Sequence, residues 1–401
     1  MEGRFPFLTR WKARRFDLWV FVLAAVLRLA ALAVFQWKGL GDSYGRDLYF
    51  NLALSWLGRL PMPEFDATHP PLFTLMIAGI LGVLRTSSQY PILLLNVLVG
   101  SATPLLLRRF GGRLVDEKTA RLAALWLAVD PAVIFFTPQL QTETIFIAMM
   151  LLFLYGVVRE WNKPSSLRVV WLGLWGGLCV SFRSVFGAFP GVLFFAVWRS
   201  KGFFKAVVFC ALLAPGWFLP SAVWTYRNYR KYGRLVPLSG QMGWNLYEGF
   251  TLDRDTVRTH PADMAAEATR NGIPDRDVGK YFFDKTMIVV RENPAQAALI
   301  VAGKAALYWR PWLYDPYTLW QRVLMGGYFV ALFAFALLGA RAALASGAPW
   351  GAVWAALLYH TAAHAVFLTT LRYRVPLEPL LCLLAAAGAL PLLAARGKSR
   401  A

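Results

Sequence analysis

Long apolar segments recur along this chain from one end to the other, and they constrain its fold more than any other feature. Of its 401 residues, 58% are hydrophobic and only 16% are charged, whereas a soluble domain carries about 25% charged residues. Runs of roughly 17 to 25 apolar residues have the length of membrane-crossing helices. A transmembrane β-barrel would need short alternating segments, and residues 149–158 do not alternate. The sequence therefore predicts an all-α, polytopic membrane protein.

We expect about ten transmembrane helices in a single integral membrane domain, residues 1–401. The predicted spans cover residues 18–37, 91–107, 120–137, 142–158, 169–182, 186–198, 206–225, 323–340, 350–370 and 375–395. The apolar segment 71–84 has about half the length of a comfortable span, so we expect a juxtamembrane helix there. With that helix at the surface, the short loops rich in Lys and Arg all fall on the cytoplasmic side, as the positive-inside rule requires. Both termini are then cytoplasmic.

The net charge of +20 does not require a nucleic-acid partner. Lys and Arg at helix ends, facing anionic membrane lipids, account for it. The three cysteines, Cys179, Cys210 and Cys382, stand singly in apolar segments. We interpret them as small buried side chains, since they form no zinc or redox pattern.

Two outer regions remain, residues 38–90 with juxtamembrane helices and residues 226–322 with helical segments. The first gathers Asp42 and Asp47 directly after an apolar run. Carboxylates at a bilayer surface are costly unless they have a task. Either one can accept a proton from a hydroxyl nucleophile, and either can equally be a solvated loop acid or a helix cap. Both interpretations stay open from spacing alone.

Farther along the same loop, Glu64, Asp66 and His69 offer oxygen and imidazole ligands. Such a set can hold a divalent cation. The alternative is an ordinary loop in which Pro70 and Pro71 start the next helix. A divalent cation is the only cofactor that the residues suggest.

Charged side chains also occur near the outer ends of later spans. Glu143 either shapes a substrate pocket or is a first-turn acid favoured by the helix dipole. Arg183, Arg372 and Arg374 lie in short outer turns, where the positive-inside rule disfavours them. A guanidinium group suits phosphate, although snorkelling to lipid headgroups also explains such residues. We expect the three arginines to bind a substrate phosphate.

Four segments in this order resemble the GT-C superfamily of membrane glycosyltransferases, in particular the bacterial relatives of protein O-mannosyltransferases and of the lipid A aminoarabinose transferase. They are residues 42–49 with His69-Pro70-Pro71-Leu72, residues 138–146, residues 224–229 with 243–249, and residues 372–379. Ser43 follows Asp42, so the paired Asp-Glu of the protein O-mannosyltransferases is missing, which leaves the subfamily and a protein acceptor open.

The resemblance implies transfer of a sugar from a polyprenyl phosphate to a hydroxyl acceptor, with inversion, at the outer face of the bacterial cytoplasmic membrane. It implies that Asp42 is the catalytic carboxylate, with Asp47 as the alternate. The hypothesis places further residues in the substrate pocket, namely Tyr49, His69, Glu143, Asn245 and Tyr247. It leaves the acceptor open among glycan, lipid and protein.

Two other functions remain in view. A lipid or solute transporter would need polar residues along a path near mid-membrane, for which Arg28 and Asp130 are the candidates. A polymerase or ligase of lipid-linked glycans would use a similar outer site and would differ mainly in its acceptor.

Overall fold

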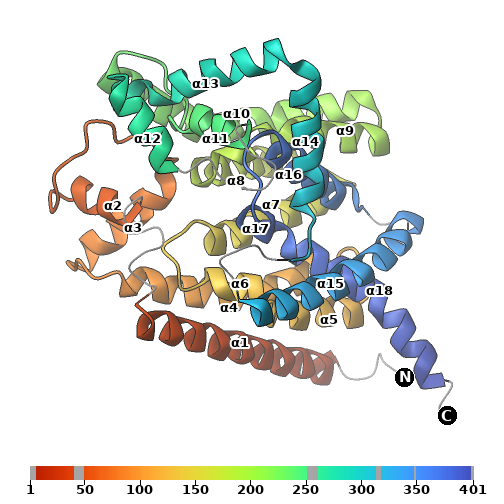
Figure 1. The fold of residues 1–401 in the computed structure, drawn as a ribbon. Helices are drawn as coiled ribbons and strands as arrows, with labels where there is room; N and C mark the ends of the chain where they lie inside the picture. The colour runs from red at the N-terminus through yellow and green to blue at the C-terminus, as the bar shows by residue number, and fades with distance from the viewer. Residues whose placement is uncertain (1–5, 40–48, 251–260, 313–317, 347–348, 399–401) are drawn as a thin grey trace.

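The computed structural model describes residues 6–39, 49–250, 261–312, 318–346 and 349–398, and over these ranges the protein is helical with no strand (Figure 1). The first half contains α1 (Pro6–Trp37), α2 (Asn51–Trp56), α3 (Pro71–Val83), α4 (Tyr90–Gly111), α5 (Glu117–Ala128), α6 (Pro131–Phe136), α7 (Glu143–Glu160), α8 (Ser166–Phe182), η3 (Ser184–Ala188) and α9 (Phe189–Lys201). The second half contains α10 (Phe203–Tyr232), α11 (Met242–Phe250), α12 (Pro261–Arg270), α13 (Asp275–Glu292), α14 (Pro294–Tyr308), α15 (Leu319–Ala345), α16 (Gly351–Val366), α17 (Leu371–Arg374), η4 (Val375–Leu377) and α18 (Glu378–Lys398).

The all-α membrane fold is confirmed, whereas the number of spans is not. By length and composition, five helices of the described chain can cross a membrane, within α1, α4, α10, α15 and residues 371–392. The predicted span 120–137 is instead two helices, α5 and α6. The break falls at Asp130, whose carboxylate accepts a hydrogen bond from the Val133 N–H and caps α6, with Pro131 as its first residue. A proline and a cap together end one helix and begin the next.

Small residues allow the long helices to pack closely. Between α15 and α18, a Cβ added to Gly339 would lie 1.8 Å from the Leu384 carbonyl oxygen, and one added to Gly388 would lie 2.1 Å from that of Phe335. Side chains of any size would push these backbones apart. Such contacts between small residues are the usual means of helix association in lipid.

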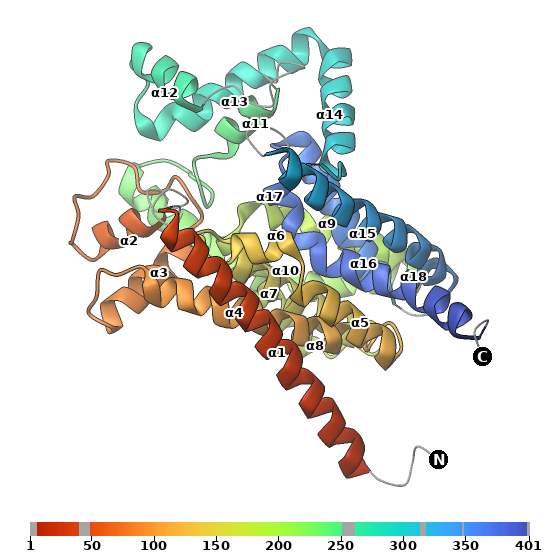
Figure 2. The same ribbon diagram turned by 60° about the horizontal axis from the view of Figure 1, so that its bottom comes forward.

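Helices α11, α12 and α13, which belong to the predicted outer region 226–322, form a separate layer that we call the outer layer. Figures 1 and 2 show α12 and α13 at one end of the molecule, opposite the end where α1 begins and α18 finishes. Phe282 of α13 is fully buried there, in a small core with Met264 and Ala268. The ring of Tyr247 lies 4.9 Å from that of Phe282.

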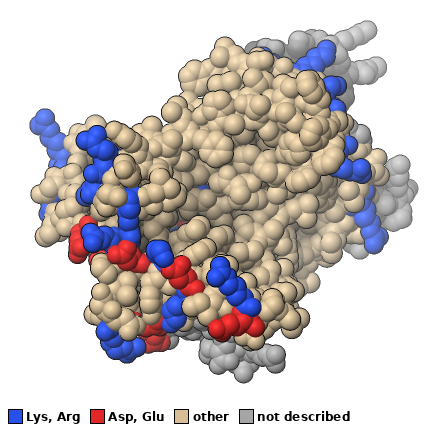
Figure 3. All heavy atoms as spheres, turned by 90° about the horizontal axis from the view of Figure 1, so that it is seen from above, with Lys and Arg blue, Asp and Glu red and all other residues tan. Residues whose placement is uncertain are grey.

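The space-filling view from this end shows charged side chains of both signs gathered on one side, further Lys and Arg side chains along the opposite edge, and an almost uncharged surface between them (Figure 3). Ion pairs of α13 belong to this outer layer, among them Lys280–Asp284 and Lys285–Glu267. The outer layer therefore carries charged side chains on its exposed side.

Candidate active site

Glu143 is the centre of a buried ion cluster, a name we use for Glu143, Arg183 and Arg372. Its residue is fully buried at the first position of α7. Oε1 accepts hydrogen bonds from Nη1 of Arg183 at 3.1 Å and from Nε of Arg372. Oε2 is buried and has no hydrogen-bond partner. One carboxylate oxygen thus serves two cations.

The two arginines reach this carboxylate from different elements. Arg183 follows the last residue of α8 in extended conformation, with φ −143°, and its guanidinium carbon lies 5.4 Å from the Phe146 ring centre and 5.5 Å from that of Tyr373. Arg372 belongs to the short α17, and 28% of its side chain is exposed. Within the described residues, two guanidinium groups against one carboxylate leave one positive charge over. A partly exposed, uncompensated guanidinium is suited to bind a phosphate.

The first outer loop lies against the ion cluster. The Tyr49 ring meets that of His69 edge to face at 4.9 Å and that of Phe73 at 5.1 Å. Burial raises the pKa of Tyr49, an effect that the charge of nearby Arg372 opposes. Burial and the charge of Arg372 lower the pKa of His69 to about 4. Both side chains are therefore neutral near pH 7. Of the predicted site residues, the structure brings Tyr49, His69, Glu143, Arg183 and Arg372 to one place.

Asp42 and Asp47, the predicted catalytic carboxylates, lie outside the described residues. The described chain resumes at Tyr49, two positions beyond Asp47.

Arg374 does not share the surroundings of Arg372. Its side chain is 1% exposed and its Nε lies 3.3 Å from Oε1 of Glu378. Its Nη1 donates to the carbonyl oxygen of Arg310 at 2.6 Å, and the guanidinium stacks 4.3 Å from the Phe329 ring centre. The predicted phosphate-binding role does not fit this burial. Residues two positions apart in a helix face different sides, and Arg372 and Arg374 stand two apart in α17.

The predicted metal ligands, Glu64, Asp66 and His69, do not lie together as a metal site in the structure. No group of three His, Cys, Asp or Glu side chains able to hold a metal occurs in the part of the chain that the structure describes. Glu64 is exposed. Both carboxylate oxygens of Asp66 are engaged by Arg227, at 2.6 Å and 2.5 Å, and Lys231 lies 2.9 Å from Oδ2. Because two cations already neutralise the Asp66 carboxylate, it is not available to bind a metal ion.

Asp66 instead fixes the first outer loop to the end of α10, and we call this contact the Asp66 clamp. The Tyr232 hydroxyl donates to Oδ1 of Asp66 at 2.5 Å, and the Trp56 ring nitrogen donates to Oδ2 at 3.2 Å. Arg227 stacks 4.6 Å from the Trp224 ring centre. These hydrogen bonds and ionic contacts hold the pKa of the Asp66 carboxyl well below its usual range, against the effect of burial.

Asn245 and Tyr247 lie on α11 rather than in the ion cluster. The Tyr247 ring packs on Phe282, and the Lys285 ammonium lies 4.9 Å from its centre. Asn245 is half-buried, and its side chain makes no hydrogen bond with the ion cluster. The predicted place of both residues in the pocket is not supported by this arrangement.

Two buried histidines, His360 and His364, lie beside the ion cluster and were not predicted from the sequence. The His364 ring stacks on Tyr373 at 4.6 Å, and the His360 ring lies 6.0 Å from that of His364. Neither ring nitrogen of His360 has a hydrogen-bond partner. Their spacing of four residues in an apolar segment indicates that both rings lie on one helix face, and this pattern could have identified them.

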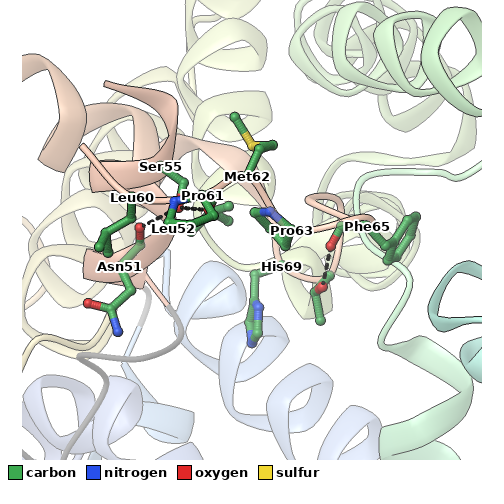
Figure 4. Close-up of a pocket in the computed structure, with 10 residues that line it drawn as sticks. Asn51, Leu52, Ser55, Leu60, Pro61, Met62, Pro63, Phe65 and His69 are labelled. Carbon is green, nitrogen blue, oxygen red and sulfur yellow. Dashed lines mark hydrogen bonds between the residues drawn. The ribbon is translucent and has the colours of Figure 1, made fainter. Parts of the chain in front are cut away.

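Two hollows open near this site. A groove of about 710 Å³, the α10 groove, is lined mainly by α10 and residues 235–238 and reaches Ser184, the neighbour of Arg183. A cavity of about 430 Å³, the first-loop cavity, lies between α2 and the following loop and reaches His69 (Figure 4). The α10 groove is almost wholly apolar, since Trp217, Phe218 and Leu238 are among its walls.

Comparison with known proteins bears on this arrangement. Residues 68–224 match the model of the family described as dolichyl-phosphate-mannose-protein mannosyltransferase. The matched segment contains His69, Glu143 and Arg183. No curated protein sequence matches the chain.

Solved structures of an oligosaccharyltransferase from Archaeoglobus fulgidus share the fold. The archaeal oligosaccharyltransferase AglB, in complex with an inhibitory peptide and a dolichol-phosphate, aligns with a TM-score of 0.55 and 12% identity over 97% of this chain and 52% of that one. The apo form of the oligosaccharyltransferase from the same organism aligns with a TM-score of 0.58 and 15% identity over 94% and 50%. This chain therefore spans about half the length of these structures. The family match and the shared fold agree with the resemblance found in the sequence: residues 68–224 are similar to the dolichyl-phosphate-mannose-protein mannosyltransferase family, and the fold of the chain is similar to that of the oligosaccharyltransferase structures.

Proposed function

We propose that this protein transfers a sugar from a polyprenyl-phosphate donor to a hydroxyl acceptor, with inversion, at the outer face of the bacterial cytoplasmic membrane. The observation that carries the proposal is the ion cluster. Arg183 and Arg372 share one oxygen of Glu143, and Arg372 is partly exposed. A phosphate at Arg372 would neutralise the charge left over among these groups.

The α10 groove supports a lipid-linked donor. It lies along a helix long and apolar enough to cross a membrane. Phe218 and Tyr229, which line it, are 62% and 52% exposed. An isoprenoid chain in this groove would bury apolar surface, while its phosphate would reach the arginines next to Ser184. Burial of apolar area contributes about 25 cal/mol per Å².

The proposed chemistry needs two roles from the protein, a base for the acceptor and cations for the leaving phosphate. Asp42, or Asp47 as the alternate, removes the proton of the acceptor hydroxyl as its oxygen attacks the anomeric carbon. The bond from that carbon to the phosphate oxygen breaks, and polyprenyl phosphate leaves with the bonding electrons. Arg372 and Arg183 stabilise the charge that develops on the phosphate. The attack and the departure take place on opposite faces of the sugar ring, which inverts the anomeric configuration.

The arrangement of the helices agrees with an outer-face site. α1 begins and α18 finishes at the end opposite α12 and α13 (Figure 2). Cytoplasmic termini would therefore place the polar layer of α12 and α13 outside. The transporter hypothesis gains no support from its two candidate residues. Arg28 donates to the Ala24 and Ala128 carbonyl oxygens, and Asp130 caps α6, so both have structural roles.

Binding of a short-chain polyprenyl phosphate to the purified protein in nanodiscs tests the donor site. Replacing Arg372 by alanine should weaken binding by one to two orders of magnitude, because a charge-assisted hydrogen bond contributes about 1.5–3 kcal/mol. Arg341→Ala is the matched control, since Arg341 is an exposed arginine of α15. Equal affinity of the Arg372→Ala variant and the wild type would contradict a phosphate site at Arg372. Loss of sugar transfer in Asp42→Asn, with donor binding retained, would support the assignment of the base.

A further inference from the structure

The first-loop cavity differs from the ion cluster in having no charged side chain among its described lining residues. Its walls come from α2, from residues 60–63 and from the turn at Phe65, Thr68 and His69. Figure 4 shows these side chains around the opening, with the His69 ring at its inner side. Among the lining residues that the structure describes, none is Asp, Glu, Lys or Arg. A phosphate or carboxylate would therefore lose hydration there without gaining a counter-charge.

The polar groups of the cavity fit hydroxyls. The Ser55 hydroxyl donates to the Pro61 carbonyl oxygen at 2.8 Å and the Thr68 hydroxyl to that of Phe65 at 3.3 Å, so both oxygens keep lone pairs for an incoming donor. His69 is 8% exposed, and its ring nitrogens have no hydrogen-bond partner among the described residues. A neutral imidazole both donates and accepts a hydrogen bond.

The apolar walls fit the carbon face of a sugar ring. Of the lining residues, Pro61, Met62 and Pro63 are exposed, whereas Leu52 and Phe65 are buried. The volume of about 430 Å³ lies in the lower part of the range for small-ligand sites. It exceeds what a single Ser or Thr side chain would fill and is large enough for a pyranose ring, which has an apolar face and several hydroxyls.

The position of the cavity connects it to the ion cluster. His69 contacts Tyr49 edge to face, and the charge of Arg372 acts on both side chains. The α10 groove comes near the cluster at a different point, Ser184, which is the chain neighbour of Arg183. A donor in the groove and a second ligand in the cavity would thus meet at the cluster from two different elements. We propose that the first-loop cavity is the acceptor site and that the acceptor is an uncharged pyranose.

The Asp66 clamp gives this cavity a fixed wall. Phe65, which lines the cavity, packs on Tyr232 at 5.0 Å, and Tyr232 holds Asp66. The Gly240 N–H donates to the Ala67 carbonyl oxygen at 2.8 Å. A pocket whose wall is held by buried contacts is preorganised for its ligand, which lowers the cost of binding.

The acceptor assignment rests on the proposed function, but its binding test does not. Saturation-transfer NMR would measure neutral methyl glycosides against the full-length protein in nanodiscs, with a sugar phosphate and a serine-containing peptide as comparison probes. Leu60→Trp fills the cavity from its rim, where Leu60 is 40% exposed. Leu84→Trp is the matched control, because Leu84 is 56% exposed and lies outside the cavity. Met62→Trp serves as the second filling variant if Leu60→Trp does not fold.

We expect at least one methyl glycoside to bind the wild type and the Leu84→Trp variant, and to lose tenfold or more in affinity when the cavity is filled. Equal binding to filled and unfilled proteins would overturn the proposal. Binding of only the peptide, or of only the sugar phosphate, would also overturn it. Polyprenyl-phosphate binding, measured on the same samples, should be unchanged by Leu60→Trp. If the wild-type protein did not bind polyprenyl phosphate, that result would count against the donor hypothesis and not against the acceptor site.

Discussion

Glu143 accepts a hydrogen bond from Nε of Arg372 across 229 residues of sequence, and this contact joins the start of α7 to the turn before α18. Arg183 reaches the same carboxylate oxygen. The pairing keeps two guanidinium groups in fixed positions at a place where Oε2 of Glu143 has no partner. A site built this way is charged before any substrate arrives, which is the preorganisation that electrostatic catalysis requires.

Glu143→Gln should destabilise the protein, because it leaves two guanidinium groups without their carboxylate. Removing one partner of a buried ion pair costs about 3–5 kcal/mol. Thermal unfolding in detergent should therefore show a lower Tm than the wild type. Added polyprenyl phosphate should raise the Tm of the variant more than that of the wild type, since its phosphate supplies the missing negative charge. Equal shifts for both proteins would contradict a phosphate at this cluster.

Arg374→Ala should behave differently from Arg372→Ala. It removes a buried cation from Glu378 and from the carbonyl oxygen of Arg310, so we expect a loss of about 3–5 kcal/mol in stability. Folded protein recovered at low temperature should still bind polyprenyl phosphate with wild-type affinity. Comparing Tm and affinity for the two variants separates the roles, and a loss of affinity in Arg374→Ala without a loss of stability would show that Arg374 contacts the donor.

The membrane character of the chain was predictable because it depends on composition and on run length. The number of spans was not. Apolar runs indicate where helices can cross a membrane, but Asp130 and Pro131 divide one run into two short helices. Other helices, such as the 13-residue α9, are short because turns interrupt them. Hydropathy averages over such breaks and does not report them.

The candidate site was predictable where one residue type suits one chemistry. Arg372 and Glu143 were expected near a substrate, and the structure places them together. Arg374 looked equivalent to Arg372, but the conformation of α17 turns it to the opposite side. Asp66 looked like a metal ligand because its partners, Arg227 and Lys231, follow about 160 residues later. Contacts at that separation depend on tertiary packing, which a single sequence does not contain.

Asp66→Asn should loosen the first outer loop at neutral pH. The variant loses the charge that Arg227 and Lys231 contact, and a buried charged hydrogen bond contributes about 1.5–3 kcal/mol. Asp277→Asn is the control, because its pair with Arg234 is about one-third exposed and such surface pairs contribute at most about 1 kcal/mol. Limited proteolysis should cut the loop of the Asp66 variant faster than that of the control.

The clamp also has a pH signature. The folded pKa of Asp66 is depressed, so its contribution to stability is present above the unfolded value of about 3.9 and is lost as pH falls through the folded value. The stability difference between wild type and Asp66→Asn should therefore stay constant from pH 8 to pH 5. A difference that disappears near pH 6 would contradict the clamp.

Lys304 should make stability rise with pH in the alkaline range. Its side chain is almost fully buried and donates to the carbonyl oxygens of Val366 and Phe367 at 2.9 Å and 2.7 Å. Burial lowers its pKa to about 8, whereas the unfolded value is about 10.4. Between these two values the unfolded chain binds more protons than the folded protein. The free energy of unfolding therefore increases with pH in this window, by at most about 1.4 kcal/mol per pH unit for one proton.

The Lys304→Met variant isolates this effect, because all other titrating groups are common to both proteins. Unfolding in mixed micelles, followed from pH 7 to pH 10.5, should give a wild-type curve that rises relative to the variant above pH 8 and runs parallel to it below. Parallel curves over the whole range would mean that Lys304 is solvated and that α14 is not fixed to the end of α16 through its ammonium. Phe367 precedes α17 by only a few residues. Loss of the hydrogen bond from Lys304 to Phe367 should therefore also shift Arg372, which would change the affinity for polyprenyl phosphate.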